Sequence, residues 1–492
     1  MMGFGRLRKR PGEFENLRTF LWAFVCILPL CLLAYTPYIS DQLLYDDIGI
    51  LFYFRSVRQF SWLDCLLPLD NGFLRPLQML IIKLIHSIWG LLPHPYHICM
   101  IIAHAGVAAT LAMVFRACAE VSRWVAVLAG AAFGVSLAAF PTVYMISNLA
   151  DCLLAIALLL LIHTWRVWLQ TGRLRYVWLA AGCVMLAVLS KETGIMAIVP
   201  MALLNWVSRK TAPRRTLWFV AAVAIFCAGY GLTAYYFQKT NGLSYVHDGT
   251  SLIDWKNGAG NLASMMTSTL MPGGITLKPW LMGGTANVVT IIVGVLMGAA
   301  GIAALILMAT SRANYRLKLA AAVYLTAIAS AWPVVLLDLP HYSGQQQPIG
   351  RYAYTATALV YVAIGIVVAH IPVSNRLRKW GVVALSLWIA GQVIVIRKSP
   401  GAREFERNAK EWERFVKETR KVAQGWTPPE LVTVHSGEPY GSILLPENYA
   451  NTLWRLYLPD LLANYYSNRT IPESTRAYIF DGKRLTESPL PQ

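Results

Sequence analysis

Long runs of apolar residues alternate with short polar or basic segments over most of the chain. A run of roughly 20 apolar residues can cross the hydrocarbon core of a bilayer as an α-helix, and a recessed helix needs fewer. The pattern therefore predicts an all-α polytopic membrane protein with about 11 transmembrane helices. The predicted ranges are 19–38, 97–115, 124–141, 149–165, 176–190, 194–208, 216–237, 286–309, 317–337, 351–371 and 379–396.

Basic residues cluster at alternate ends of these predicted helices. The clusters comprise Arg116 with Arg123, Arg166 with Arg173 and Arg175, Arg209 with Lys210, Arg214 and Arg215, Arg312 with Arg316 and Lys318, and Arg376 with Arg378 and Lys379. Cytoplasmic loops are enriched in Lys and Arg, so we predict that these ends and the basic N-terminus face the cytoplasm. This assignment of sides, which we call the parity, holds only if the apolar run 76–92 does not cross the membrane. We predict that this run forms a helix lying in the membrane interface.

The same parity predicts which segments lie on the outer side. These are the first outer loop 39–96, the turn 142–148, the turn at Lys191-Glu192, the long outer loop 238–285, the segment 338–350 and the C-terminal region 397–492. The loop 238–285 is long enough to cover a site as a lid. In the C-terminal region, 402–424 has an amphipathic helical pattern and 431–434 a strand-like one. We therefore predict a transmembrane module, 1–396, and a small extracytoplasmic α/β domain, 397–492.

Composition supports a membrane protein and excludes several other classes. Of 492 residues, 56% are hydrophobic and 14% are charged, whereas about a quarter of a soluble domain is charged. The net charge of +18 is confined to short clusters, which favours orientation in a bilayer over nucleic-acid binding. The eight cysteines contain no C-x-x-C pair, so no disulfide framework or zinc site is predicted.

The predicted hairpin 176–208 is short for a double crossing. Each arm of roughly 15 residues is about 22 Å long, less than the roughly 30 Å apolar thickness. The tip, which contains Lys191, should therefore lie below the outer surface. A recessed cation is costly unless it meets an anion, and a lipid phosphate is a suitable one.

Carboxylates and cations on the outer side suggest group-transfer chemistry. Asp46 and Asp47 stand just beyond the first strongly apolar run, in the predicted outer loop 39–96. A carboxylate can act as general base toward an attacking hydroxyl, and Lys or Arg can stabilise a departing phosphate. Arg can do so through two parallel hydrogen bonds. This division of labour fits sugar transfer from a polyprenyl phosphate.

A series of short motifs extends this interpretation. In order they are Tyr45-Asp46-Asp47, Leu74-Arg75-Pro76-Leu77, His94-Pro95-Tyr96-His97 with His104, Phe140-Pro141 followed by Asn148 and Asp151, Leu189-Ser190-Lys191-Glu192-Thr193-Gly194, and Gly350-Arg351-Tyr352-Ala353-Tyr354. The series resembles the GT-C superfamily of membrane glycosyltransferases over roughly residues 20–370. It is most similar to the branch of transmembrane, tetratricopeptide-repeat O-mannosyltransferases and their bacterial relatives. The repeats themselves are missing, and the C-terminal domain takes their place.

The resemblance implies an inverting transfer from a polyprenyl-phosphate monosaccharide and interfacial helices in the first outer loop. It implies that the first-loop acid is the catalytic base, which corresponds to Asp46, with Asp47 as the second candidate. The remaining candidates are Lys191, Arg351 and Arg75 for the donor phosphate, and Asp151, Glu192, His97 and Tyr352 for supporting or acceptor contacts.

Each candidate also has a structural interpretation. The Asp46-Asp47 pair or Asp151 could cap a helix, Arg75 could snorkel, Glu192 could pair with Lys191, His97 could be a satisfied core residue, and Tyr352 could belong to an aromatic belt. Arg351 heads its predicted helix on the outer side, against the positive-inside bias, which favours an anionic ligand.

Several alternatives stay open at this stage. A transporter or flippase of lipid-linked sugars would also place cations in the membrane, although such proteins usually show repeated halves and no repeat is visible in this chain. A catalytically silent scaffold of the same fold is a third class. Mannose follows from the resemblance, but the residues do not select the sugar, the protein or glycan acceptor, or a divalent metal. Composition favours a bacterial inner membrane with the C-terminal domain in the periplasm.

Overall fold

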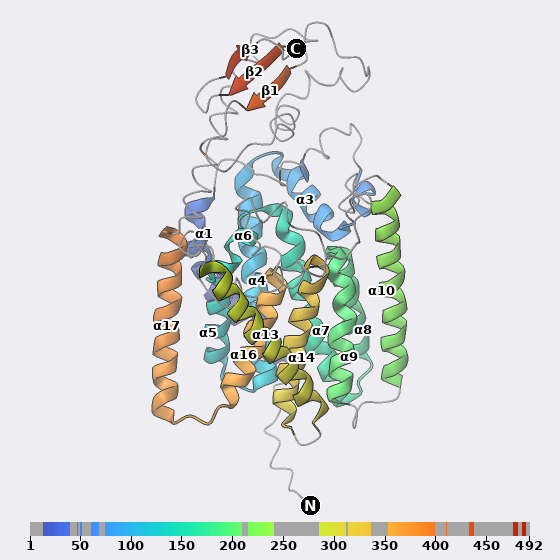
Figure 1. Cartoon of the computed structure of the whole chain (residues 1–492), viewed down its shortest axis with the longest axis vertical. Helices are drawn as coiled ribbons and strands as arrows, with labels where there is room; N and C mark the ends of the chain where they lie inside the picture. The colour runs from blue at the N-terminus through green and yellow to red at the C-terminus, as the bar shows by residue number, and fades with distance from the viewer. Residues whose placement is uncertain are drawn as a thin grey trace, which may run out of the picture.

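The structure is a computed structural model of a helical bundle with a small sheet near the C-terminus (Figure 1). It describes residues 13–39, 47, 50–51, 61–67, 74–208, 215–240, 285–310, 313–335, 353–398, 410, 432–436, 476–480 and 485–488. The α-helices are α1 (Glu13–Tyr35), α3 (Pro76–Trp89), α4 (Pro93–Ala119), α5 (Arg123–Gly134), α6 (Phe140–Val143), α7 (Leu149–Thr171), α8 (Arg175–Ser190), α9 (Ile198–Val207), α10 (Arg215–Thr240), α13 (Thr285–Ala309), α14 (Tyr315–Val335), α16 (Tyr354–His370) and α17 (Asn375–Lys398). Short 3₁₀ segments include η2 (Asp64–Leu66), η3 (Leu137–Ala139), η4 (Ile146–Asn148) and η5 (Glu192–Ala197).

Within the described residues the predicted transmembrane ranges overlap these helices, with two departures. The range 194–208 comprises part of the 3₁₀ segment η5 and then α9, which begins at Ile198. The range 124–141 is predicted as a single helix, but α5 ends at Gly134 and a 3₁₀ segment precedes α6. Pro141 lacks a backbone N–H and stands in the first turn of α6, where that group has no helical partner. The interruption brings polar backbone into the same end of the bundle as η4.

The bundle has a buried core and an apolar outer surface. In the core α4 packs against α1, α5 and α7, and α7 packs against α8. Trp165 of α7 and Phe133 of α5 are fully buried there. On the outside, Trp218 and Ile225 of α10 are 80% and 75% exposed, and Leu387 of α17 is 69% exposed. An apolar surface of this extent is unsuited to water.

Five helical segments in the described part of the chain are long and apolar enough to cross a membrane. They are Phe14–Tyr35, Pro93–Ala119, Ile146–Thr171, Thr216–Thr233 and Asn375–Lys398. Apolar helical segments of 10–17 residues also occur, among them α8, whose 16 residues span about 24 Å. Together with the apolar exterior, these helices make the chain an integral membrane protein.

Helix α3 lies at one end of the bundle (Figure 1). Its 14 residues span about 21 Å, which is too short to cross an apolar layer of roughly 30 Å. It buries Met79 and Ile82 and exposes Leu84 and Ile88. Gly90, with φ +59°, ends the helix, and the chain turns into α4. The prediction that 76–92 forms a short amphipathic helix is confirmed, and its place in a membrane interface stays a prediction.

Three strands are described in the C-terminal region. Strand β2 (Arg476–Phe480) lies between β1 (Val432–Ser436), to which it is parallel, and β3 (Leu485–Ser488), to which it is antiparallel. Strand β1 agrees with the strand predicted at 431–434. Figure 1 shows the sheet beyond the end of the bundle at which α3 lies. The helix predicted over 402–424 lies outside the described residues except for Lys410.

Candidate active site at the α3 end of the bundle

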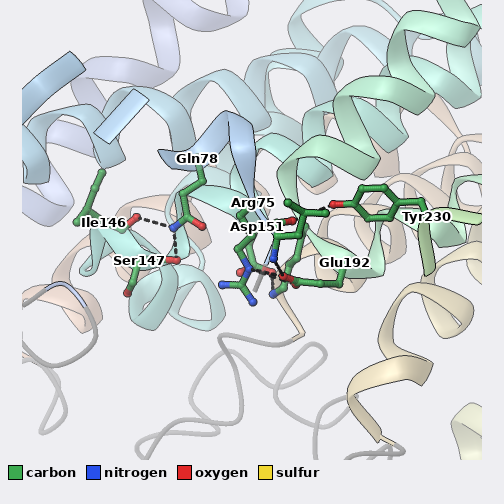
Figure 2. A network of polar contacts seen from close by, with 9 residues as sticks. Arg75, Gln78, Ile146, Ser147, Asp151, Glu192 and Tyr230 are labelled. Carbon is green, nitrogen blue, oxygen red and sulfur yellow. Dashed lines mark hydrogen bonds and ion pairs between the residues drawn. The ribbon is translucent and has the colours of Figure 1, made fainter. Parts of the chain in front are cut away.

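Four segments that are distant in sequence meet at the α3 end of the bundle. They are residue Asp47, the start of α3, the region from η4 to the first turn of α7, and the turn between α8 and η5. Figure 2 shows Arg75, Asp151 and Glu192 side by side, with Gln78 to one side and Tyr230 of α10 to the other. The prediction that these turns share one end of the molecule is confirmed by the hydrogen bonds between them.

Lys191 forms a buried ion pair with Asp151. Its Nζ lies 2.7 Å from Oδ1 of Asp151, and the two side chains are 8% and 7% exposed. Asp151 is in the first turn of α7, where the helix dipole also favours a carboxylate. The N-cap position of α7 belongs to Asn148, so interpreting Asp151 as a helix cap is wrong. Among the described residues, Lys191 thus pairs with a carboxylate of the chain, and its depth in a membrane stays a prediction.

Glu192 binds Arg75 and the backbone in front of α3. Both of its carboxylate oxygens lie 3.1 Å from Nε of Arg75, and Oε1 also accepts a hydrogen bond of 3.1 Å from the N–H of Leu74. The suggested pairing of Glu192 with Lys191 is therefore wrong. Lys191 has an extended backbone, with φ −157° and ψ 149°, and successive side chains of an extended segment point to opposite sides. Two adjacent residues thus reach two different partners.

Asp47 is held by the peptide of Ser147. Its Oδ1 accepts a hydrogen bond of 2.8 Å from the Ser147 N–H, and the residue is fully buried. On the other side of Ser147, its carbonyl accepts a hydrogen bond of 2.6 Å from Nε2 of Gln78. Nε2 of Gln78 also donates a hydrogen bond of 3.5 Å to the carbonyl of Ile146. Figure 2 draws both contacts of Gln78. A buried carboxylate with a fixed donor is held in one orientation.

These contacts, together with the backbone between the contacting residues, connect the site. Asp47 and Gln78 both bind the peptide of Ser147, and Gln78 lies on the helix that begins after Arg75. Arg75 binds Glu192, the adjacent residue Lys191 binds Asp151, and Asp151 follows Ser147 by four residues. Polar networks of this kind, when their members are paired, fix a unique geometry in a low-dielectric interior.

Gln78 and Tyr230 belong to this network but were not predicted from the sequence. The signal for Gln78 is its position three residues after Arg75 in an otherwise apolar run, which places both on one helix face. Tyr230 donates a hydrogen bond of 2.9 Å to the Leu74 carbonyl, and nothing in its apolar surroundings marks it in the sequence.

Two histidines of the predicted motif, His97 and His104, are buried in the bundle. His97 is 4% exposed, and its ring lies 5.7 Å from the ring of Tyr144. His104 is fully buried, with Nδ1 2.6 Å from the hydroxyl of Tyr354 and Nε2 2.9 Å from the carbonyl of Gly134. His104 therefore ties α4 to α5 and α16. In the described part of the chain, no group of three or more His, Cys, Asp or Glu side chains is placed to hold a metal ion.

Several predicted features lie outside the described residues. They are Asp46, Arg351, Tyr352 and residues 241–284 of the long outer loop predicted at 238–285. The first three residues of that range belong to the end of α10, and Thr285 begins α13. The proposed roles of these features as base, phosphate ligand, acceptor contact and lid remain predictions.

Comparisons with known proteins identify no family for this chain. No protein-family model matches it, and no curated protein sequence does. Among solved structures, ArnT from Cupriavidus metallidurans bound to undecaprenyl phosphate aligns with 96% of this chain and 94% of its own, at 12% identity and a TM-score of 0.36. The apo state of ArnT aligns with 94% and 93%, at 13% identity and a TM-score of 0.39. Scores this low assign no residue role or reaction to this chain.

Proposed function

We propose that this chain is an inverting membrane glycosyltransferase of the GT-C type. It would move a sugar from a polyprenyl-phosphate monosaccharide to a hydroxyl of a protein or glycan acceptor on the outer face of the membrane. The observation that carries the proposal is that Asp47, Arg75, Asp151, Lys191 and Glu192 are linked by hydrogen bonds and by short stretches of backbone. These residues come from separate motifs of the sequence resemblance, which supports a shared site.

The proposed reaction needs one base and a phosphate-binding group. Asp46 would accept the proton of the acceptor hydroxyl, whose oxygen would then attack the anomeric carbon of the donor. The bond from that carbon to the phosphate oxygen breaks, and polyprenyl phosphate leaves with the electron pair. Attack opposite the leaving group inverts the anomeric configuration.

Arg75 and Lys191, with Arg351, would stabilise the charge on the departing phosphate. Arg75 and Lys191 are both partly or largely buried, and each lies beside a carboxylate that holds its position. Asp151 would then orient Lys191, and the Ser147 amide would orient Asp47 beside the base. This ordering of charges before the donor arrives is what electrostatic stabilisation of a leaving group requires.

The location of the polar network favours catalysis over transport. A flippase would move a sugar headgroup along a polar path through the bilayer. In the described part of the chain, the ion pairs Arg75–Glu192 and Lys191–Asp151 lie together at the α3 end, among the motifs of the resemblance. We place this end in the periplasm of a bacterial inner membrane, with the N-terminus cytoplasmic. Mannose is the first donor sugar to test, and the assay should be run with and without a divalent metal ion.

A proteoliposome experiment separates the two functions. Purified protein is reconstituted with polyprenyl-phosphate sugars, and two products are followed: free polyprenyl phosphate, and intact donor that has crossed the bilayer. A glycosyltransferase releases polyprenyl phosphate and links the sugar to an acceptor. If intact donor crosses the bilayer and no polyprenyl phosphate is released, the protein is a flippase. If neither product is detected, the protein is a catalytically silent scaffold.

A further inference from the structure

Leu74 stands immediately before α3, and both polar groups of its peptide are bound from other elements. Its N–H donates to Oε1 of Glu192 at 3.1 Å, and its carbonyl accepts from the Tyr230 hydroxyl at 2.9 Å. Leu74 is only 9% exposed, so these groups need partners within the protein. The backbone entering α3 is therefore clamped between η5 and α10.

The same carboxylate fixes the next side chain. Both oxygens of Glu192 lie 3.1 Å from Nε of Arg75, and the two side chains are each 19% exposed. A charge-assisted contact to Nε restricts rotation of the guanidinium plane, because Nε lies at the base of that plane. One side chain thus sets both the backbone at Leu74 and the orientation of the Arg75 head group.

Glu192 and Tyr230 both lie outside α3. Pro76 begins the helix without a backbone N–H, and the side chain of Arg75, at the N-cap position, makes no capping hydrogen bond to the first turn. The start of α3 and the Arg75 side chain are instead tied to Glu192 of η5 and Tyr230 of α10. Figure 2 shows these two residues converging on the start of α3 from the side opposite Gln78.

We propose that Glu192 and Tyr230 are positioning residues that orient Arg75 for the donor phosphate. This inference rests on the proposed function, since it assigns Arg75 to phosphate binding in that reaction. Neither residue would touch the reacting atoms. Their loss should weaken donor binding more than it slows the transfer step.

Two substitutions of Glu192 separate its two contacts. Glu192→Gln keeps an amide oxygen that can accept from Leu74 but removes the charge facing Arg75. Glu192→Ala removes both contacts. We expect each to raise the KM for the donor about tenfold, which corresponds to loss of one charge-assisted hydrogen bond, with a much smaller change in kcat. A purely structural role would instead lower the amount of active enzyme at constant KM.

Tyr230→Phe removes one hydroxyl and should raise the donor KM about threefold, as expected for a neutral hydrogen bond. Tyr361→Phe is the matched control. It makes the same chemical change on α16, where the hydroxyl lies 3.4 Å from Oγ of Ser136, and should leave the donor KM unchanged. Equal effects of the two variants would overturn the role of Tyr230.

Amide hydrogen exchange provides a readout that does not depend on turnover. Protection of the Leu74 amide should persist in Glu192→Gln and be lost in Glu192→Ala, while the Met79 amide, bonded to the Arg75 carbonyl, stays protected. If the wild type consumes no donor, the proposed function fails. Amide exchange then still tests whether Glu192 binds the Leu74 N–H. Unchanged Leu74 protection in Glu192→Ala, or an unchanged donor KM in both Glu192 variants of an active enzyme, would overturn the inference.

Discussion

The Nζ of Lys191, at the end of α8, lies 2.7 Å from Oδ1 of Asp151, in the first turn of α7. Both side chains are more than nine-tenths buried. A pair of this kind is held because each charge neutralises the other where water is scarce. The contact joins the first turn of α7 to the end of α8.

Breaking this pair should cost more than removing it. Asp151→Asn or Lys191→Met alone removes one charge of a buried ion pair and should destabilise the protein by about 3–5 kcal/mol. The double variant removes both charges of the pair, so much of that stability should return. Thermal unfolding of the four proteins in detergent measures this coupling. Additive losses would show that the two charges do not stabilise each other.

Activity gives a second reading of the same variants. If Lys191 binds the donor phosphate, the double variant should regain stability without regaining transfer. Recovery of transfer in the double variant would reduce the pair to a structural role.

Gly194 should be intolerant of any side chain. A Cβ at this position would lie 2.1 Å from the Ala187 carbonyl oxygen and 2.7 Å from the Val188 nitrogen. Both are backbone atoms, so the clash could be relieved only by moving the main chain. Gly194→Ala should therefore cost about 1–3 kcal/mol and displace Lys191 and Glu192 from their partners. Gly182→Ala on α8, where a Cβ meets nothing within 4 Å, is the matched control and should change stability by less than about 1 kcal/mol. Similar unfolding temperatures for both variants would contradict the packing of the turn against α8.

Cysteine labelling tests the orientation in the membrane. Leu92, between α3 and α4, is 60% exposed at the predicted outer end, and Arg173, after α7, is exposed at the predicted cytoplasmic end. A membrane-impermeant maleimide applied from outside should label Leu92→Cys but label Arg173→Cys only after the membrane is opened. The wild type, whose eight cysteines are all buried or half-buried, gives the background. The opposite pattern would invert the topology.

The sequence carries the helical framework because apolar length and basic clusters report directly on the bilayer. The short helix at 76–92 followed from keeping the basic clusters on one side. The break after α5 was missed because Ala, Phe and Leu continue through it, and only Pro141 hints at a new helix start.

The pairing within the site could not be read in the same way. Lys191 and Glu192 are adjacent, which suggests a pair, but the extended backbone at Lys191 sends them to different partners. Their true partners, Asp151 and Arg75, lie 40 and 117 positions away. Contacts of that sequence separation are set by helix packing, which the linear pattern does not encode.

The most direct test of the account is release of polyprenyl phosphate by purified protein in lipid, over a panel of polyprenyl-phosphate sugars. Wild type is compared with Asp46→Asn and Asp47→Asn. We expect one donor to be consumed and Asp46→Asn to lower its turnover by at least about 100-fold, as for loss of a general base. Asp47→Asn retains an oxygen that can accept from the Ser147 N–H and should lose less. If no donor is consumed, or if both variants match the wild type, these carboxylates do not catalyse sugar transfer.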